Sequence, residues 1–188
     1  DLVKYYVDKT KYKSNDYDNI INRITELTTG CNGSDIKKLC NEAGIYAVQN
    51  DDKEIELKHF EEAFDYTLLG SKSNTVLSSS DKERIAYHEC GHALINYILT
   101  PENPPQKISI IPRKNGVMGF SQTYINDNKK LLTLDDYNNQ CKILMAGRIA
   151  ESLKYDGKIS QGSYDDLKKI NEIQKQIISI LCINDKDN

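Results

Sequence analysis

The sequence predicts a mainly α-helical fold with a small β element, divided between two domains. Apolar residues recur every three or four positions over most of the 188 residues, a spacing that is typical of amphipathic helices. One region alone, near residues 105–124, combines a strand pattern with a turn signal, so little β structure is expected. The small polar residues of SKSNTVLSSS interrupt the helical pattern and predict a linker at residues 71–79.

The first predicted domain, residues 1–70, is a small helical bundle. The stretch DNIINRITELTTG reads as a helix with Asp18 as its N-cap and Gly30 after its last turn. A second helix follows in NGSDIKKLCNEAGIYAVQ, where Asn32 or Ser34 can cap the start. A third helix in ELKHFEEAFDYTLLG and the opening DLVKYYV complete the bundle.

The second predicted domain, residues 80–188, starts with a long helix. Ser80 and Glu83 match an S-x-x-E capping box, and Pro101 ends the helical pattern. Two short strands are expected at residues 107–111 and 120–124, joined by a Lys-Asn-Gly turn.

Two further helices are expected towards the end of the chain. One begins after Thr133 as its cap, and the last begins near Asp165. Their apolar positions at helical spacing are Tyr137, Cys141, Leu144, Met145 and Ile149 in the first and Leu167, Ile170, Ile173, Ile177 and Ile180 in the second.

Composition and charge exclude several classes of function. The hydrophobic fraction of 38% and charged fraction of 28% are those of an ordinary globular domain. The sequence contains no run of eighteen apolar residues, the length that could span a bilayer. A net charge of −3, with lysines interspersed among acids, provides no basic surface for nucleic acid. The five cysteines lie far apart without a C-x-x-C pair, which indicates free thiols in a reducing compartment.

The motif HECGH within the long helix is typical of a zinc site. On a helix, His88 and His92 lie one turn apart on one face, and Glu89 lies beside them. Zinc (Zn2+) lowers the pKa of a bound water to about 7, and an adjacent carboxylate can then act as general base in peptide hydrolysis. Gly91, which weakens a helix, predicts close packing of another backbone there.

A third ligand is needed to complete such a site. The metzincin extension would require histidine at position 98, where this sequence has Ile98. His59 lies in the other domain and is expected to be solvated. A carboxylate is therefore predicted, and the candidates are Glu102, Glu151, Asp165, Asp166 and Glu172. Asp166 is favoured because it begins a helix after a glycine-containing loop, while Asp165 and Glu151 remain alternatives.

Several motifs together resemble a known family. AYHECGHALINYIL, QKISIIPR, GRIAE and ISQGSYDDLKK resemble, in this order, the protease domain of the FtsH family of AAA+ zinc metalloproteases. Upstream, TTGCNGSDIKKLCNEAGIYA resembles the helical lid that ends the AAA+ module. The resemblance implies an AAA+ lid bundle over residues 1–70, followed over residues 80–188 by a mostly helical zincin-type metalloprotease domain with a short edge strand or hairpin, truncated at its C-terminal end.

The resemblance also implies roles for individual residues. The family's zinc ligands correspond to His88, His92 and Asp166, and its catalytic base to Glu89. The lid positions Gly33 and Ser34 correspond to the edge of the family's nucleotide pocket. Residues 107–111 are implied to be the edge strand along which an unfolded substrate is laid.

The implied function is that of a fragment of an ATP-dependent zinc metalloendopeptidase that degrades unfolded or membrane proteins. This chain contains no G-x-x-x-x-G-K-[ST] motif, the loop that holds the phosphates of ATP. The resemblance therefore implies that ATP binds to a part of the full-length protein outside this chain. The family forms homo- or hetero-hexamers anchored in a membrane through segments absent here, in bacterial inner, mitochondrial or plastid membranes. The alternative is a catalytically silent assembly or nucleotide-lid module of a ring-forming AAA+ protein.

Overall fold

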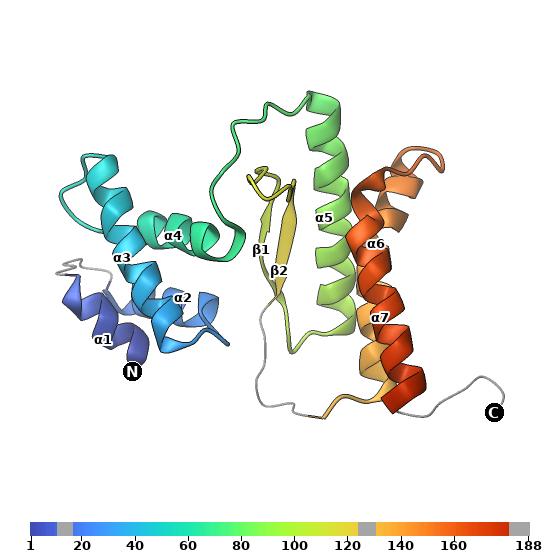
Figure 1. The fold of residues 1–188 in the computed structure, drawn as a ribbon, viewed down its shortest axis with the longest axis horizontal. Helices are drawn as coiled ribbons and strands as arrows, with labels where there is room; N and C mark the ends of the chain where they lie inside the picture. The colour runs from blue at the N-terminus through green and yellow to red at the C-terminus, as the bar shows by residue number, and fades with distance from the viewer. Residues whose placement is uncertain (11–16, 124–130, 181–188) are drawn as a thin grey trace. The chain divides into compact units, whose positions relative to one another are not determined.

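The computed structural model describes residues 1–10, 17–123 and 131–180. Over these residues the chain forms seven α-helices and one two-stranded antiparallel sheet (Figure 1). The expectation of a mainly α-helical fold with a small β element is confirmed.

The chain divides into two compact units, and each unit contains two chain segments. Unit 1 consists of Asp1–Asn74 and Pro112–Val117, and unit 2 of Thr75–Ile111 and Met118–Asn188. The first passage between the units falls within the expected linker. The segment Pro112–Val117 packs in unit 1, although its sequence position is inside the second predicted domain.

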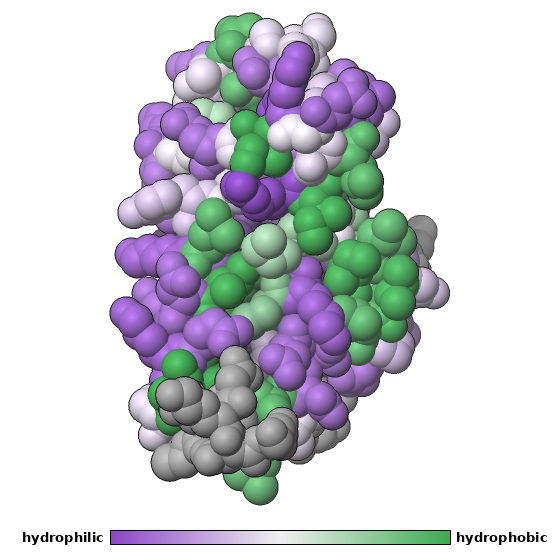
Figure 2. Space-filling view, turned by 90° about the vertical axis from the view of Figure 1, so that its right-hand side faces the viewer, coloured by the Kyte–Doolittle hydropathy of each residue, from purple (hydrophilic) through white to green (hydrophobic). Residues whose placement is uncertain are grey.

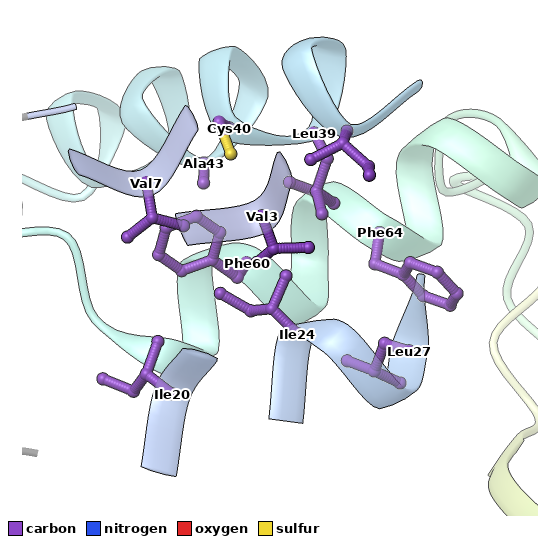
Figure 3. Packing of buried hydrophobic residues seen from close by; sticks show 12 residues of the cluster. Val3, Val7, Ile20, Ile24, Leu27, Leu39, Cys40, Ala43, Phe60 and Phe64 are labelled. Carbon is purple, nitrogen blue, oxygen red and sulfur yellow. The ribbon is translucent and has the colours of Figure 1, made fainter. Parts of the chain in front are cut away.

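Four helices build unit 1, and their apolar faces meet in one core. They are α1 (Leu2–Lys9), α2 (Tyr17–Leu27), α3 (Gly33–Gln49) and α4 (Leu57–Leu69). Figure 3 shows side chains from all four helices pointing towards one another, namely Val3, Val7, Ile20, Ile24, Leu27, Leu39, Cys40, Ala43, Phe60 and Phe64. Burial of these side chains stabilises the bundle, since each large apolar group contributes roughly 1.5–3 kcal/mol.

Two expected caps in unit 1 have different outcomes. Helix α2 begins at Tyr17, so Asp18 lies in its first turn and the expectation of an N-cap there is wrong. At α3 the cap is Asn32, whose side chain accepts hydrogen bonds from the backbone N–H groups of Ser34 and Asp35. The Asn32 N–H in turn donates to the Asp35 carboxylate. This capping box satisfies backbone N–H groups that have no carbonyl partner within the helix.

His59 was expected to be solvated, and this is wrong because its side chain is completely buried in unit 1. Its Nδ1 accepts a hydrogen bond from the Glu56 N–H at the start of α4, 2.9 Å away. The other ring nitrogen, Nε2, therefore carries the hydrogen and donates to Asp52 over 2.9 Å. His59 thus fixes the beginning of α4.

A buried ion pair holds Pro112–Val117 in unit 1. Arg113 donates from NH2 to Asp65 Oδ2 over 2.9 Å, and both side chains are buried. The Ser73 N–H donates to the Pro112 carbonyl, and the Lys114 N–H donates to the Ser71 carbonyl. Because a buried charge is costly without a partner, Arg113 ties this segment to α4.

Unit 2 is built around one long helix. It contains α5 (Ser79–Leu99), β1 (Pro105–Ser109), β2 (Phe120–Thr123), α6 (Leu134–Lys154), the 3-10 turn η1 (Gln161–Ser163) and α7 (Tyr164–Ile180). The hairpin of β1 and β2 packs on α5, α6 packs along another side of α5, and α7 packs on α6 (Figure 1).

Several expected boundaries in unit 2 shift. The N-cap of α5 is Ser78, whose Oγ accepts from the Asp81 N–H, so the expected box at Ser80 is wrong. Strand β1 begins two residues early because Pro105, which has no N–H, is tolerated as a first strand residue. The expected end of the second strand at residue 124 lies outside the described residues.

The later helices follow the expected pattern more closely. Thr133 caps α6 and forms a capping box with Asp136. Ile177 is buried in α7, whereas Ile149 on α6 is half exposed despite its helical spacing. No helix in the described part of the chain is long and apolar enough to cross a membrane.

The described cysteines carry free thiols, as expected. They are Cys31, Cys40, Cys90 and Cys141. Cys182 lies outside the described residues.

Candidate metal centre

Helices α5 and α6 run antiparallel and approach each other closely at Gly91. A Cβ atom built on Gly91 would lie 2.6 Å from the Ala146 carbonyl oxygen and 2.8 Å from the Ala150 Cβ. Such a contact is impossible for any larger residue, so the expected close packing at Gly91 is confirmed. The inner face of α6 is thereby brought next to the two histidines of α5.

His88, His92 and Asp166 converge at this crossing. The two Nε2 atoms are 3.0 Å apart, and Asp166 Oδ2 lies 3.2 Å from His88 Nε2 and 3.4 Å from His92 Nε2. Ligands on a tetrahedral zinc ion with bonds of about 2.0–2.2 Å are separated by about 3.4 Å. Within the described ranges this is the one group of three or more possible ligand side chains that could hold a metal ion.

The outer nitrogen of each imidazole is fixed by a hydrogen bond. His88 Nδ1 is 2.9 Å from Glu151 Oε1, and His92 Nδ1 is 2.7 Å from the Ile143 carbonyl oxygen. Both acceptors require an N–H on Nδ1, which leaves each Nε2 with a lone pair directed at the shared space. This is the tautomer and orientation that metal-binding histidines adopt.

Gly147 on α6 leaves room for an ion between the histidines. A Cβ atom at this position would lie 2.5 Å from His92 Nε2 and 2.7 Å from His88 Nε2. The sequence therefore places a residue without a side chain where the ligand atoms meet. The donor set, its spacing and this space all fit zinc.

Glu151, one alternative ligand, lies on the other side of the His88 ring. It is buried and accepts hydrogen bonds from Arg84 and from the Ser160 N–H and hydroxyl, besides His88. Burial alone would raise the pKa of this carboxyl, but these donors outweigh burial and lower it. Glu151 is therefore an ionised partner of a ligand and does not face the metal position.

The remaining carboxylate candidates are also kept apart from the three ligand atoms. Asp165 is exposed, whereas the neighbouring Asp166 is half-buried. Glu102 and Glu172 do not belong to the group of possible metal ligands formed by His88, His92 and Asp166. Burial opposes ionisation of Asp166, yet in the metal-free chain protonated imidazoles of His88 and His92 beside it hold the pKa of this carboxyl well below its ordinary value.

Glu89 is buried beside the converging group. Burial raises the pKa of its carboxyl, and the nearby imidazoles of His92 and His88 reduce this effect. For His88, burial lowers the pKa, but hydrogen bonds to Asp166 and Glu151 outweigh it and raise the pKa in the absence of a metal.

Comparison with protein families identifies most of unit 2. Residues 75–186 match the model of peptidase family M41. The chain belongs to peptidase family M41. Residues 17–62 match the AAA+ lid domain, so the M41 segment is preceded by a lid. The resemblance described above is confirmed by these matches.

Curated relatives of this M41 chain are longer than the chain itself. It is 36% identical over 179 residues to the ATP-dependent zinc metalloprotease FtsH of Pseudomonas putida, covering 95% of this chain and 28% of that protein. It is 32% identical over 174 residues to the mitochondrial inner membrane m-AAA protease component YTA10 of Saccharomyces cerevisiae, covering 92% and 23%. The chain thus spans about a quarter of the length of these relatives.

Glu151 and Gly147 are the residues of the M41 site that sequence reasoning did not assign. The sequence predicts Glu151 only as an alternative ligand and contains Gly147 only within the motif GRIAE. The signal that could have revealed Glu151 is its helical spacing of four and five residues from Gly147 and Ala146, which places an acidic residue on the same face of α6 as two small ones.

The interior of the M41 unit is polar where a core would be expected. The buried polar residues in unit 2 are His88, Glu89, Asn96, Glu151 and Ser163. Large apolar residues instead lie exposed on its helices, including Leu94, Tyr97, Ile98, Leu153 and Ile178. Figure 2, which views the side where α6 and α7 lie in Figure 1, shows hydrophobic residues among hydrophilic ones on the surface. Burial of polar and charged side chains costs free energy and is typical of an active site.

A cavity of about 400 Å³ lies one helical turn from the ligands. Its apolar lining residues are Ile143 and Leu144 on α6 and Ile173 on α7. The polar side chain of Asn96 on α5 also lines it. Asn96 follows His92 by four residues and therefore lies on the same face of α5. The cavity is thus next to the metal position.

The lid residues Gly33 and Ser34 form the first turn of α3 in unit 1. Ser34 is exposed and Gly33 is half-buried. The Ser34 N–H is already donated to Asn32 Oδ1, and the assignment of nucleotide contacts to Gly33 and Ser34 stays a prediction.

Proposed function

We propose that this chain is the peptidase region, with its lid, of an ATP-dependent zinc metalloendopeptidase. The observation that carries the proposal is the convergence of His88 Nε2, His92 Nε2 and Asp166 Oδ2 beside the buried carboxylate of Glu89. His88, His92 and Asp166 would hold the ion, and Glu89 would be the general base.

A bound zinc ion supplies Lewis acidity that lowers the pKa of water and polarises a peptide carbonyl. Glu89 accepts the proton of the attacking water and delivers it to the amine that leaves. Burial raises the pKa of this carboxyl in the metal-free chain, and a general base works best when its pKa approaches the working pH. Glu151 stays ionised and holds the His88 imidazole in place, and the Ile143 carbonyl holds that of His92.

The properties of the whole protein belong to this proposal as well. The lid match and the names of the relatives, which include "ATP-dependent" and "m-AAA protease component", support ATP use and assembly with other subunits. The assembly that we propose is a homo- or hetero-hexamer. Unfolded or membrane proteins would be the substrates. The membrane would be a mitochondrial or bacterial inner membrane, reached through segments outside this chain, and plastid membranes remain within the family's range.

Exchange of the base tests the mechanism separately from metal binding. Glu89→Gln keeps stoichiometric zinc because no ligand atom is lost, but hydrolysis of an unfolded casein falls by about 10²–10⁴-fold. Asp166→Ala lowers the zinc content measured by atomic emission in the purified protein. Full peptidase activity in Glu89→Gln contradicts the mechanism, and a wild-type protein without zinc under non-chelating conditions contradicts the metal site.

A further inference from the structure

Arg84 lies on α5 one turn before His88 and contacts the carboxylate that orients this histidine. We infer that Arg84 is a positioning residue, which raises the zinc affinity of the site by holding Glu151 in place. The inference rests on the proposed function, since it concerns the metal ligands of the same site.

The Glu151 carboxylate is shared between His88 and Arg84. Its Oε1 lies 2.9 Å from His88 Nδ1, and its Oε2 accepts a hydrogen bond from Arg84 NH1 over 2.9 Å. The Glu151 side chain is only 2% exposed, whereas that of Arg84 is 25% exposed. Arg84 therefore reaches the buried carboxylate from the surface of unit 2.

A chain of bonded groups connects Arg84 with the proposed metal position. The guanidinium binds Oε2 of Glu151 and limits rotation of the carboxylate, so that Oε1 stays opposite His88 Nδ1. A hydrogen bond at Nδ1 fixes the tautomer and the direction of Nε2, the proposed ligand atom. Loss of a partner that orients a ligand typically weakens metal binding by about 10- to 100-fold. Arg84 is therefore expected to affect zinc binding without touching the ion.

Ser160 alone would hold Glu151 less firmly. Its N–H and hydroxyl donate to the two carboxylate oxygens over 3.0 Å each, but both are neutral groups. Arg84 adds a guanidinium, and a hydrogen bond between charged groups is roughly twice as strong as one between neutral groups. Because Glu151 is buried, this ion pair also offsets part of the cost of removing its charge from water.

Two further contacts fix the guanidinium itself. Arg84 NH1 also donates to the Lys158 carbonyl over 3.0 Å, and Arg84 Cζ lies 4.0 Å from the centroid of the Tyr155 ring. Tyr155 is the C-cap of α6, and Lys158 follows in the segment that leads to η1. A planar guanidinium can stack on an aromatic ring while its N–H groups donate at the edge. The position therefore suits arginine better than lysine.

Lys154 on α6 offers a comparison with Arg84. Its Nζ lies 3.2 Å from Glu83 Oε1 and 4.7 Å from the centroid of the Tyr87 ring. Lys154 thus joins the same two helices and also places a positive charge over an aromatic ring. Its ion-pair partner is the exposed Glu83 side chain and not the buried Glu151. Lys154→Met is therefore the matched control for removal of a cation at this helix pair.

A double-mutant cycle tests whether Arg84 acts through Glu151. Competition with a zinc-binding dye measures the zinc affinity of wild type, Arg84→Met, Glu151→Gln and the double variant, with folding checked by circular dichroism. Each single variant should bind zinc about tenfold or more weakly. The double variant should bind no more than about threefold more weakly than Glu151→Gln, because both changes remove one interaction. Lys154→Met should retain wild-type affinity.

Arg84→Lys supplies a second measurement. It keeps a positive charge that can pair with Glu151 but loses the stacked guanidinium, so its zinc affinity should lie between those of Arg84→Met and wild type. The inference is overturned by wild-type affinity in folded Arg84→Met, by additive losses in the cycle, or by equal affinities of Arg84→Lys and Arg84→Met. An equal loss in Lys154→Met also overturns it. A wild-type chain that binds no zinc contradicts the proposed function, and the inference with it.

Discussion

Three carboxylates at the centre of unit 2 share one chemistry and differ in their surroundings. Asp166 is held ionised by two imidazoles, and Glu151 by Arg84 and Ser160 in addition to His88. Burial raises the pKa of Glu89, and the imidazoles of His92 and His88 oppose this through their charge. Ligand, orienting partner and base are therefore distinguished by the hydrogen bonds that each carboxylate receives.

Acid sensitivity of the metal-free chain follows from Glu151. Its pKa in the folded state is lower than the ordinary value of 4.5, so the folded state binds fewer protons than the unfolded state as the pH falls. Its stabilising contribution is complete above about pH 4.5 and is lost as the pH falls through the folded-state pKa. In Glu151→Gln, we expect the free energy of unfolding to depend less on pH below this value. Urea titrations of both proteins in chelator, from pH 3 to pH 7, measure the difference.

The same variant should be less stable by roughly 1–3 kcal/mol at pH 7, because a hydrogen-bonded charge has been removed. The pKa of Asp166 is also lowered by its partners, so the slope decreases without vanishing. Equal pH slopes in wild type and Glu151→Gln would show that Glu151 is not ionised by its partners.

At the scale of elements, small residues decide how closely α5 and α6 approach. Gly91 admits the backbone of α6, and Gly147 admits the two imidazoles. The histidines cannot swing away freely, because His88 is bonded to Glu151 and His92 to the Ile143 carbonyl. The crossing therefore creates the metal position as much as the ligands do.

Gly147→Ala should lose zinc while keeping all three proposed ligands. The new methyl group would lie 2.5 Å from His92 Nε2, and overpacking of about 1–3 kcal/mol corresponds to a roughly 5- to 150-fold weaker affinity. Competition with a zinc-binding dye measures the change. Gly44→Ala on α3 controls for a glycine-to-alanine change in a helix and should retain wild-type affinity. Unaltered zinc affinity in Gly147→Ala would contradict the assigned metal position.

At the scale of the molecule, the two units are stabilised in different ways. Unit 1 has an apolar core from four helices, whereas unit 2 buries charged side chains around the metal position. A ligand that binds one folded unit stabilises that unit by mass action. Zinc should therefore act on unit 2 alone.

Removal of zinc tests this division. At zinc concentrations of about 100 times Kd, binding contributes about 2.7 kcal/mol, so a chelator should lower the melting temperature of unit 2 by roughly 10 °C. Differential scanning calorimetry should resolve a second transition, from unit 1, that does not move. Phe60→Ala provides the converse control, lowering the stability of unit 1 by about 3–5 kcal/mol without changing the zinc response. Equal shifts of both transitions would contradict the assignment.

The sequence by itself determined the helical class, the short hairpin and the cap at Thr133, and it reduced the cap of α3 to Asn32 or Ser34, because periodicity and capping act between residues close in the chain. It also identified His88, Glu89 and His92, whose geometry follows from one turn of helix. Choosing Asp166 over Glu151 from the residues alone was not possible, since 63 or 78 positions separate them from His88. Only the crossing of α5, α6 and α7 decided which carboxylate faces Nε2 and which faces Nδ1. Packing of the helices of unit 1 buried His59. Packing of α6 and of the hairpin region against α5 placed Gly147 and Gly119 where a side chain would collide with site residues. Such contacts depend on packing between elements distant in sequence.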